Sequence, residues 1–211
     1  MTDTEIIEDA TDAQIADWLE SHLRQTLAEQ DGPIAIALPG GSTPFPILEL
    51  LAGRDLAFAR ISAYPTDDRL VPEDHAASNT GKLRALLEPL GVKVVSLVDA
   101  DHGPPHFALV WLGMGADGHI ASLFPNTDPR ADDPLLLRRL TPDPLPPEAP
   151  FDRITLTMPA LLDCNEFLFV MRGAEKRAVF DDALRGASDL PVARLLAARA
   201  DGPARKVTCF V

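Results

Sequence analysis

Short apolar runs alternate along the chain with stretches in which apolar residues return at helical spacing. The first helical stretch, residues 11–30, predicts an amphipathic helix with one apolar face. That face consists of Ile15, Trp18, Leu19, Leu23 and Leu27. Thr11 and Gln14 fit a capping box at its start, and Gly32 lies where a glycine often ends a helix.

Apolar runs typical of buried strands follow at intervals. The clearest is IAIAL at 34–38, and the others are 60–65, 92–98, 107–112, 153–158, 166–171 and 206–211. Helical patterns lie between many of them, at 44–52, 79–89, 174–185 and 191–200. This alternation predicts βαβ units, and hence an α/β fold with a mostly parallel sheet and helices on both faces. Ligands of such sheets bind beyond the carboxyl ends of the strands.

Residues 125–150 break the alternation. They contain eight prolines, and only LLLRRL (135–140) offers a short helical turn. A long proline-rich connection is typical of a surface excursion or an active-site flap, and we favour the surface excursion. No repeat or linker divides the chain, so we expect one domain over residues 1–211.

Composition and charge narrow the classes of function. The 46% apolar and 24% charged residues are typical of a globular protein. A formal charge of -13 argues against nucleic-acid binding, whereas an anionic small substrate needs only a local cluster of cations. No apolar run approaches the roughly 18 residues of a membrane span. The acidic start lacks the features of a signal peptide, so we expect a cytoplasmic protein.

The cysteines and histidines offer no metal site. Cys164 and Cys209 form no metal-ligand spacing with each other or with a histidine. We expect both to be buried thiols in a reducing compartment, and we expect neither a metal nor a cofactor.

A first glycine cluster, LPGGSTPFP at 38–46, follows the predicted strand 34–38. Gly40 and Gly41 permit close backbone approach, and Ser42 or Thr43 can cap the next helix. Free N–H groups at a helix start form an anion site, although a tight, well-capped turn explains the same residues. A P-loop is not indicated, because its lysine is missing.

A second cluster, LGMGADGHIASLFP at 112–125, follows the predicted strand 107–112. Gly113, Gly115 and Gly118 match the dinucleotide fingerprint, yet Pro125 follows only seven residues after the last glycine. The fingerprint opens a helix that packs on the sheet, which Pro125 does not allow, so dinucleotide binding is not expected. The loop instead brings backbone N–H groups and one imidazole to the edge of the sheet.

That imidazole, His119, is the candidate general base. Histidine has an unperturbed pKa near 6.5, so it can accept a proton from water at neutral pH. Asp117 is a candidate to orient the ring, and N–H groups of residues 113–118 are candidates to stabilise an oxyanion. Asp67 is the next carboxylate to consider as a base.

Three cations are candidates to bind an anion. Arg69 follows two aspartates at the end of a predicted strand, where a structural ion pair is the favoured interpretation from that stretch alone. Lys176 lies in the first turn of a predicted helix, where a cation opposes the helix dipole. It either faces an anion there or is solvated beside Glu175. Arg194 is a weaker candidate.

Together these stretches resemble the 6-phosphogluconolactonase family. The resemblance is carried, in the family's order and over nearly the whole chain, by PGGSTP (39–44), DDRLVP (67–72), SN (78–79), LGMGADGHIASLFP (112–125), RITLTMP (153–159) and GAEK (173–176). The fourth of these motifs is highly specific. Small departures at Asp68 and Ile120, where the family more often has glutamate and threonine, concern only the edge of the pocket.

The resemblance implies a three-layer α/β/α sandwich with a Rossmann-like sheet. It also implies metal-independent hydrolysis of 6-phosphoglucono-δ-lactone to 6-phosphogluconate, in the oxidative pentose phosphate pathway. His119 would be the general base. The substrate-binding candidates are Gly40, Gly41, Ser42, Thr43, Arg69, Gly113, Gly115, Lys176 and Arg194, of which Gly41, Ser42, Arg69 and Lys176 would surround the phosphate. The partner would be this small molecule, and the protein a monomer or weak homodimer.

Two rival functions use similar motifs. Amino-sugar-phosphate deaminases also carry a GGTP-like loop and a DGH motif, but they place a glutamate five residues after the histidine, where this chain has Phe124. A non-enzymatic sugar-phosphate sensor could dispense with the histidine, whereas His119 and Asp117 are both present. Hydrolysis of the lactone is therefore the favoured function.

Overall fold

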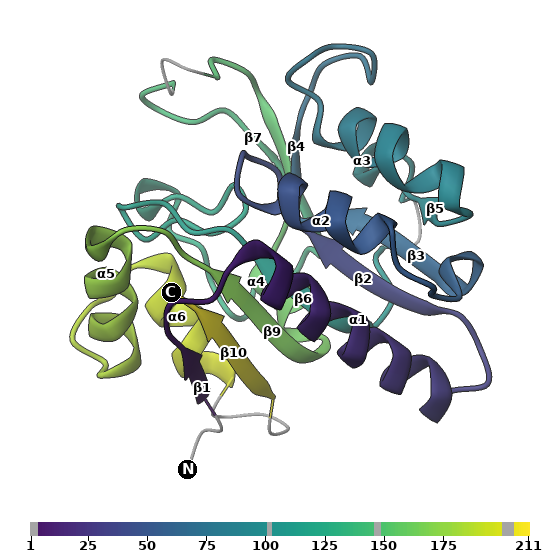
Figure 1. The fold of residues 1–211 in the computed structure, drawn as a ribbon. Coiled ribbons are helices and arrows are strands. Elements are labelled where there is room, and N and C mark those ends of the chain that lie inside the picture. The colour runs from purple at the N-terminus through teal and green to yellow at the C-terminus, as the bar shows by residue number, and fades with distance from the viewer. Residues whose placement is uncertain (1–3, 101–102, 146–148, 200–204) are drawn as a thin grey trace.

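A seven-stranded parallel sheet forms the centre of the protein in a computed structural model, which describes residues 4–100, 103–145, 149–199 and 205–211 (Figure 1). Its strands, in spatial order, are β1 (Thr4–Ile7), β10 (Lys206–Phe210), β9 (Cys164–Val170), β6 (Phe107–Leu112), β2 (Ile34–Leu38), β3 (Ile61–Pro65) and β5 (Lys93–Val94). Every neighbouring pair is parallel. The predicted α/β fold with a mostly parallel sheet is therefore confirmed.

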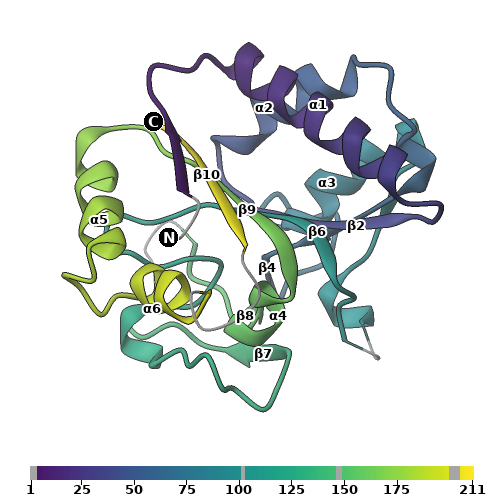
Figure 2. The same cartoon turned by 90° about the horizontal axis from the view of Figure 1, so that it is seen from below.

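Helices cover both faces of this sheet (Figure 2). One face carries α1 (Asp12–Glu29), α2 (Pro44–Ala52) and α3 (Asn79–Leu87), and the other carries α4 (Met158–Leu162), α5 (Ala174–Leu184) and α6 (Pro191–Ala198). Strand β2 shows why its sequence is apolar throughout. Ile34, Ile36 and Leu38 pack in the core under α1 to α3, whereas Ala35 and Ala37 pack in the opposite core.

A second, antiparallel sheet contains β4 (Asp67–Arg69), β8 (Arg153–Leu156) and β7 (Leu137–Leu140), with β8 in the middle. Strand β7 lies inside the proline-rich segment, so the helical turn predicted for LLLRRL is wrong. The pairing of β7 with β8, a distant partner, decides the conformation of these residues.

The remaining short elements are the 3₁₀ helices η1 (Phe58–Arg60), η2 (Glu88–Leu90), η3 (Leu97–Asp99) and η4 (Pro125–Thr127). The strand predicted over 92–98 is therefore mostly wrong, because β5 ends at Val94 and a 3₁₀ turn follows. Ser96 starts that turn by accepting a hydrogen bond from the N–H of Val98 (3.3 Å).

The ends of α1 confirm one prediction and overturn another. Thr11 and Gln14 form the predicted capping box. Gly32 does not end the helix, since the chain is already extended at Gln30. Arg60 binds the free carbonyl groups there instead, donating to Leu27, Gln30 and Gly32.

Both cysteines are buried free thiols, as the sequence predicts, and burial raises the pKa of each to about 12. Within the described part of the chain, no helix has both the length and the apolar character that crossing a membrane requires.

Candidate active site

A cleft of about 430 Å³ lies at the carboxyl ends of β2, β3, β6 and β9. Segments that directly follow these strands form most of its wall, as expected for a parallel sheet. They contribute Pro39 to Pro44 after β2, Thr66, Asp67 and Arg69 after β3, Gly113 to Gly115, His119 and Ala121 after β6, and Lys176 after β9. No described residue of the proline-rich segment lines this cleft, which fits a surface excursion.

His119 in the cleft wall pairs with Asp117, which lies next to the cleft. Nδ1 of His119 is 2.6 Å from Oδ1 of Asp117, and the His119 backbone N–H donates to the same oxygen (3.2 Å). Burial acts to raise the pKa of Asp117, but the charge and hydrogen bonds of His119 outweigh it, so the pKa lies below its ordinary value. The ionised carboxylate therefore holds the proton on Nδ1 and leaves Nε2 as the basic nitrogen.

Two positions around this pair, Gly115 and Gly118, leave no room for a side chain, and Gly118 also has a backbone conformation that favours glycine. A Cβ on Gly115 would lie 2.2 Å from Nδ1 of His119 and 2.4 Å from Oδ1 of Asp117. Gly118 has φ +75°, and a Cβ there would meet Leu190 at 2.8 Å. The loop thus turns tightly enough to seat the pair only with glycine at these positions.

Replacing Gly115 with alanine is expected to lower kcat by about 10²-fold, because the added methyl group occupies the space of the aspartate–histidine pair. Thermal unfolding should change little, since Gly115 is at the rim and not in a core. Steady-state kinetics and a melting curve on the same preparation check this. Unchanged kcat would mean that the geometry of the pair does not limit the reaction.

The N–H groups of this loop are less available than the sequence suggests. Gly115 donates its N–H to the carbonyl of His119 (2.9 Å), and Gly118 donates to Gly115 (3.0 Å). These two bonds shape the loop, so neither N–H can stabilise an oxyanion. By contrast, the N–H groups of Gly40, Gly41 and Ser42 make no hydrogen bond with the described residues.

The loop after β2 is therefore open toward the cleft. Gly41 has φ +94°, a conformation that favours glycine. Thr43 occupies the N-cap position of α2, but its side chain makes no capping bond, and Ser42 makes none either. The capping role predicted for these two hydroxyl groups is wrong, and both remain available at a helix start that favours anions.

Two cations line the cleft without a carboxylate partner among the residues that the structure describes. Arg69 donates from Nη1 to the carbonyl of Ala77 (2.8 Å) and to Oδ1 of Asn79 (3.2 Å), and Lys176 makes no hydrogen bond or ion pair with a described residue. The ion pair first favoured for Arg69 is therefore wrong. Its neighbour Asp68 is buried and instead accepts bonds from the N–H groups of Asn79 (2.6 Å) and Thr80 (2.9 Å).

Asp67 brings a second carboxylate to the cleft. Its Oδ2 accepts a hydrogen bond from the hydroxyl of Ser122 (2.5 Å), and Ser122 donates its N–H to Thr155 of β8 (3.2 Å). Asp67 is thus tied to the loop that carries His119 and to the small sheet. The structure brings it into the same cleft as His119.

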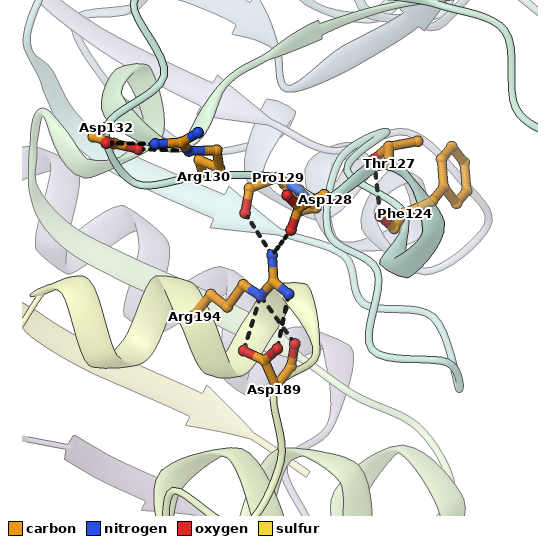
Figure 3. A network of polar contacts seen from close by, with 8 residues as sticks. All are labelled: Phe124, Thr127, Asp128, Pro129, Arg130, Asp132, Asp189 and Arg194. Atoms are coloured by element: carbon orange, nitrogen blue, oxygen red, sulfur yellow. Dashed lines mark hydrogen bonds and ion pairs between the residues drawn. The ribbon is translucent and has the colours of Figure 1, made fainter.

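The structure does not bring Arg194 into this cleft. Figure 3 shows its guanidinium held between Asp189 and Asp128. Nε and Nη2 contact the two carboxylate oxygens of Asp189 (2.9 and 2.8 Å), and Nη1 contacts Asp128 (2.5 Å). These bonds join α6 to the start of the proline-rich segment. Arg194 therefore does not line this cleft, and its predicted role in substrate binding stays a prediction.

Sequence reasoning missed two polar residues at the cleft. One is Asn79, the first residue of α3, which follows the helix cap Ser78; the Ser78 hydroxyl accepts a hydrogen bond from the N–H of Gly81 (3.0 Å). Ser122 carried no expectation. The available signal was their presence in the SN and LGMGADGHIASLFP motifs, which does not reveal their contacts.

The fold and the cleft together define an α/β protein whose cleft is lined by a histidine that is bonded to an aspartate, and by two cations that have no carboxylate partner among the described residues. The family model described as glucosamine-6-phosphate isomerases/6-phosphogluconolactonase matches residues 7–102 and 92–204. The chain belongs to this family of enzymes.

Individual relatives agree with this assignment. A 6-phosphogluconolactonase of Pseudomonas aeruginosa is 35% identical over 81% of this chain and 79% of its own length. A 6-phosphogluconolactonase of Neisseria meningitidis is 30% identical over 82% of this chain and 83% of its own length. Among solved structures, a 6-phosphogluconolactonase from Thermotoga maritima superposes with a TM-score of 0.80 at 27% identity, covering 100% of this chain and 99% of that one.

Proposed function

We propose that this protein hydrolyses 6-phospho-D-glucono-1,5-lactone to 6-phospho-D-gluconate. The observation that carries the proposal is that one cleft is lined by His119, whose ring is bonded to Asp117, and by the cations Arg69 and Lys176. A base and a phosphate site in one cleft suit a substrate with a reactive carbonyl at one end and a phosphate at the other. The relatives named above support the same substrate.

His119 acts as the general base in this mechanism. Asp117 holds the Nδ1 proton, and Nε2 takes a proton from water as the water oxygen attacks the lactone carbonyl. The bond between the carbonyl carbon and the ring oxygen then breaks. The proton on Nε2 passes to the ring oxygen, which becomes a hydroxyl group, and the base is restored. Asp67 is the alternative base.

The phosphate would lie between the loop after β2 and the two cations. Arg69 and Lys176 supply positive charge. The N–H groups of Gly40, Gly41 and Ser42 lie just before the start of α2, and a helix start favours anions. The hydroxyl groups of Ser42 and Thr43 can donate further bonds. Gly113 and Gly115 would form the floor under the lactone ring, where side chains would obstruct it.

The proposed reaction also implies a metabolic pathway and a compartment. The reaction belongs to the oxidative pentose phosphate pathway, in the cytoplasm. We expect residues 1–211 to act as one domain, as a monomer or weak homodimer, with residues 125–150 at its surface.

The rival deaminase reaction is disfavoured by Phe124. Its ring lies 4.9 Å from the His119 ring, centroid to centroid, at the sequence position where deaminases have a glutamate. An assay with freshly generated 6-phosphogluconolactone, run beside glucosamine 6-phosphate, tests the proposal. Acid release from the lactone above the spontaneous rate, with no ammonia from the amino sugar, is the expected result. Ammonia release without lactone hydrolysis would overturn it.

Overnight treatment with EDTA is expected to leave lactone hydrolysis unchanged. The water in this mechanism is activated by His119, and the described residues include no group of three or more His, Cys, Asp or Glu side chains placed to hold a metal. Activity is measured before and after dialysis. A loss that added zinc restores would contradict the mechanism.

A further inference from the structure

The side-chain amide of Asn79 is buried among three parts of the cleft wall. Asn79 is the first residue of α3 and is 1% exposed. Its Nδ2 donates to the carbonyl of Asp67 (2.8 Å), and its Oδ1 accepts from Nη1 of Arg69 (3.2 Å). The amide therefore bonds through both its nitrogen and its oxygen to β4, the strand that carries Arg69.

The third contact is with the glycine loop after β2. A Cβ on Gly40 would lie 2.1 Å from Oδ1 of Asn79 and 2.4 Å from its Nδ2. The amide thus packs directly on the Gly40 backbone, and only glycine leaves room for it. Asn79 lies between the loop with free N–H groups and the guanidinium of Arg69.

Arg69 is held on one side only. Nη1 is bonded to Ala77 and Asn79, whereas Nε is buried without a partner among the described residues and Nη2 makes no hydrogen bond with them. Nε and Nη2 form one side of the guanidinium fork, which can bind a phosphate in a bidentate manner. Fixing Nη1 therefore orients the two remaining donors.

We propose that Asn79 is a positioning residue for phosphate recognition. It holds Arg69 and the Gly40 loop at a fixed separation, so that the guanidinium and the loop N–H groups reach the same phosphate. This role rests on the proposed function only in assuming a phosphorylated ligand. It does not require that the bound ligand be hydrolysed.

The backbone of Asn79 is anchored independently of its side chain. Its N–H donates to Asp68 (2.6 Å), which also accepts from Thr80, so the start of α3 stays attached to β4 when the amide is removed. The variants Asn79→Ala and Asn79→Ser should both fold. The serine side chain is too short to reach Arg69. Both variants remove the contact with Arg69 without removing the helix.

A double-mutant cycle that combines each Asn79 variant with Arg69→Ala tests this role. The measured quantity is the affinity for 6-phosphogluconate in titration calorimetry, and gluconate, which has no phosphate, is the comparison ligand. Each Asn79 variant should weaken 6-phosphogluconate binding by about 5- to 50-fold. In the Arg69→Ala background the same change should have a clearly smaller effect, because the part that acts through Arg69 is lost and only the packing on the Gly40 loop remains. Ser78→Ala is the matched control, since it removes the cap of α3 and keeps the amide, and it should bind nearly as the wild type does.

The outcomes separate this role from the proposed reaction. The positioning role would be overturned if replacing Asn79 lowered the affinity for 6-phosphogluconate equally with and without Arg69. It would also be overturned if Ser78→Ala lowered this affinity as much as the Asn79 variants do. Unchanged affinity in Arg69→Ala would overturn it together with the proposed phosphate site. Coupling between Asn79 and Arg69 in a protein that does not hydrolyse the lactone would support the role and refute only the proposed reaction.

Discussion

Replacing His119 with asparagine is expected to lower kcat by about 10²–10⁴, with KM nearly unchanged. Asparagine keeps a polar side chain of similar reach, but it cannot accept a proton from water at neutral pH. The measurement is steady-state hydrolysis of 6-phosphogluconolactone after subtraction of the spontaneous rate, which limits the smallest kcat that can be seen. Near-normal kcat would mean that another group activates the water, and Asp67 would then be tested.

The chain supplies a matched control for this substitution. His106 also pairs with an aspartate, since its Nδ1 is 2.7 Å from Oδ1 of Asp163, but it directly precedes β6 and lies at the opposite end of that strand from His119. His106→Asn removes a comparable pair outside the cleft. Its kcat should equal that of the wild type.

The pH dependence of kcat follows from the same pair. Only the neutral imidazole accepts a proton, so kcat should rise with pH in the wild type and lose this rise in His119→Asn. Protonation of Asp117 does not cause this rise of kcat with pH. Burial acts to raise the pKa of Asp117, but the contacts with His119 lower it below that of an ordinary carboxyl group.

The parts of the site that could be predicted from the sequence are local. The strand at 107–112, the glycines that follow it and His119 are close in the chain, and glycine spacing alone indicates a sharp turn at the end of a strand. Asp117 and His119 are two residues apart, so their pairing needs no knowledge of the fold. The helices and central strands were predicted for the same reason, because periodicity is a local signal.

The errors concern contacts between distant segments. Arg69 was expected to pair with an adjacent aspartate, but Asp68 is occupied by the start of α3 and Asp67 by Ser122, which is 55 residues away. Arg194 was expected at the substrate, but Asp128 comes from a segment 66 residues away. Local sequence does not indicate such contacts between distant segments, although the other partner of Arg194, Asp189, is only five residues away.

Replacing Arg69 and Lys176 together with alanine is expected to remove most of the preference for a phosphorylated substrate. Each cation can donate a charged hydrogen bond worth about 1.5–3 kcal/mol. Because neighbouring groups are not additive, the combined fall in kcat/KM for 6-phosphogluconolactone is expected at about 10²–10⁴. The rate with unphosphorylated gluconolactone should change little, since His119 and Asp117 are intact.

The most direct measurement is therefore the ratio of kcat/KM for 6-phosphogluconolactone to that for gluconolactone, in the wild type and in the double variant. The account predicts a large ratio in the wild type that falls by about 10²–10⁴ in the variant, with the fall confined to the phosphorylated substrate. A ratio that stays the same in the variant would contradict the claim that one cleft joins a phosphate site to the base His119.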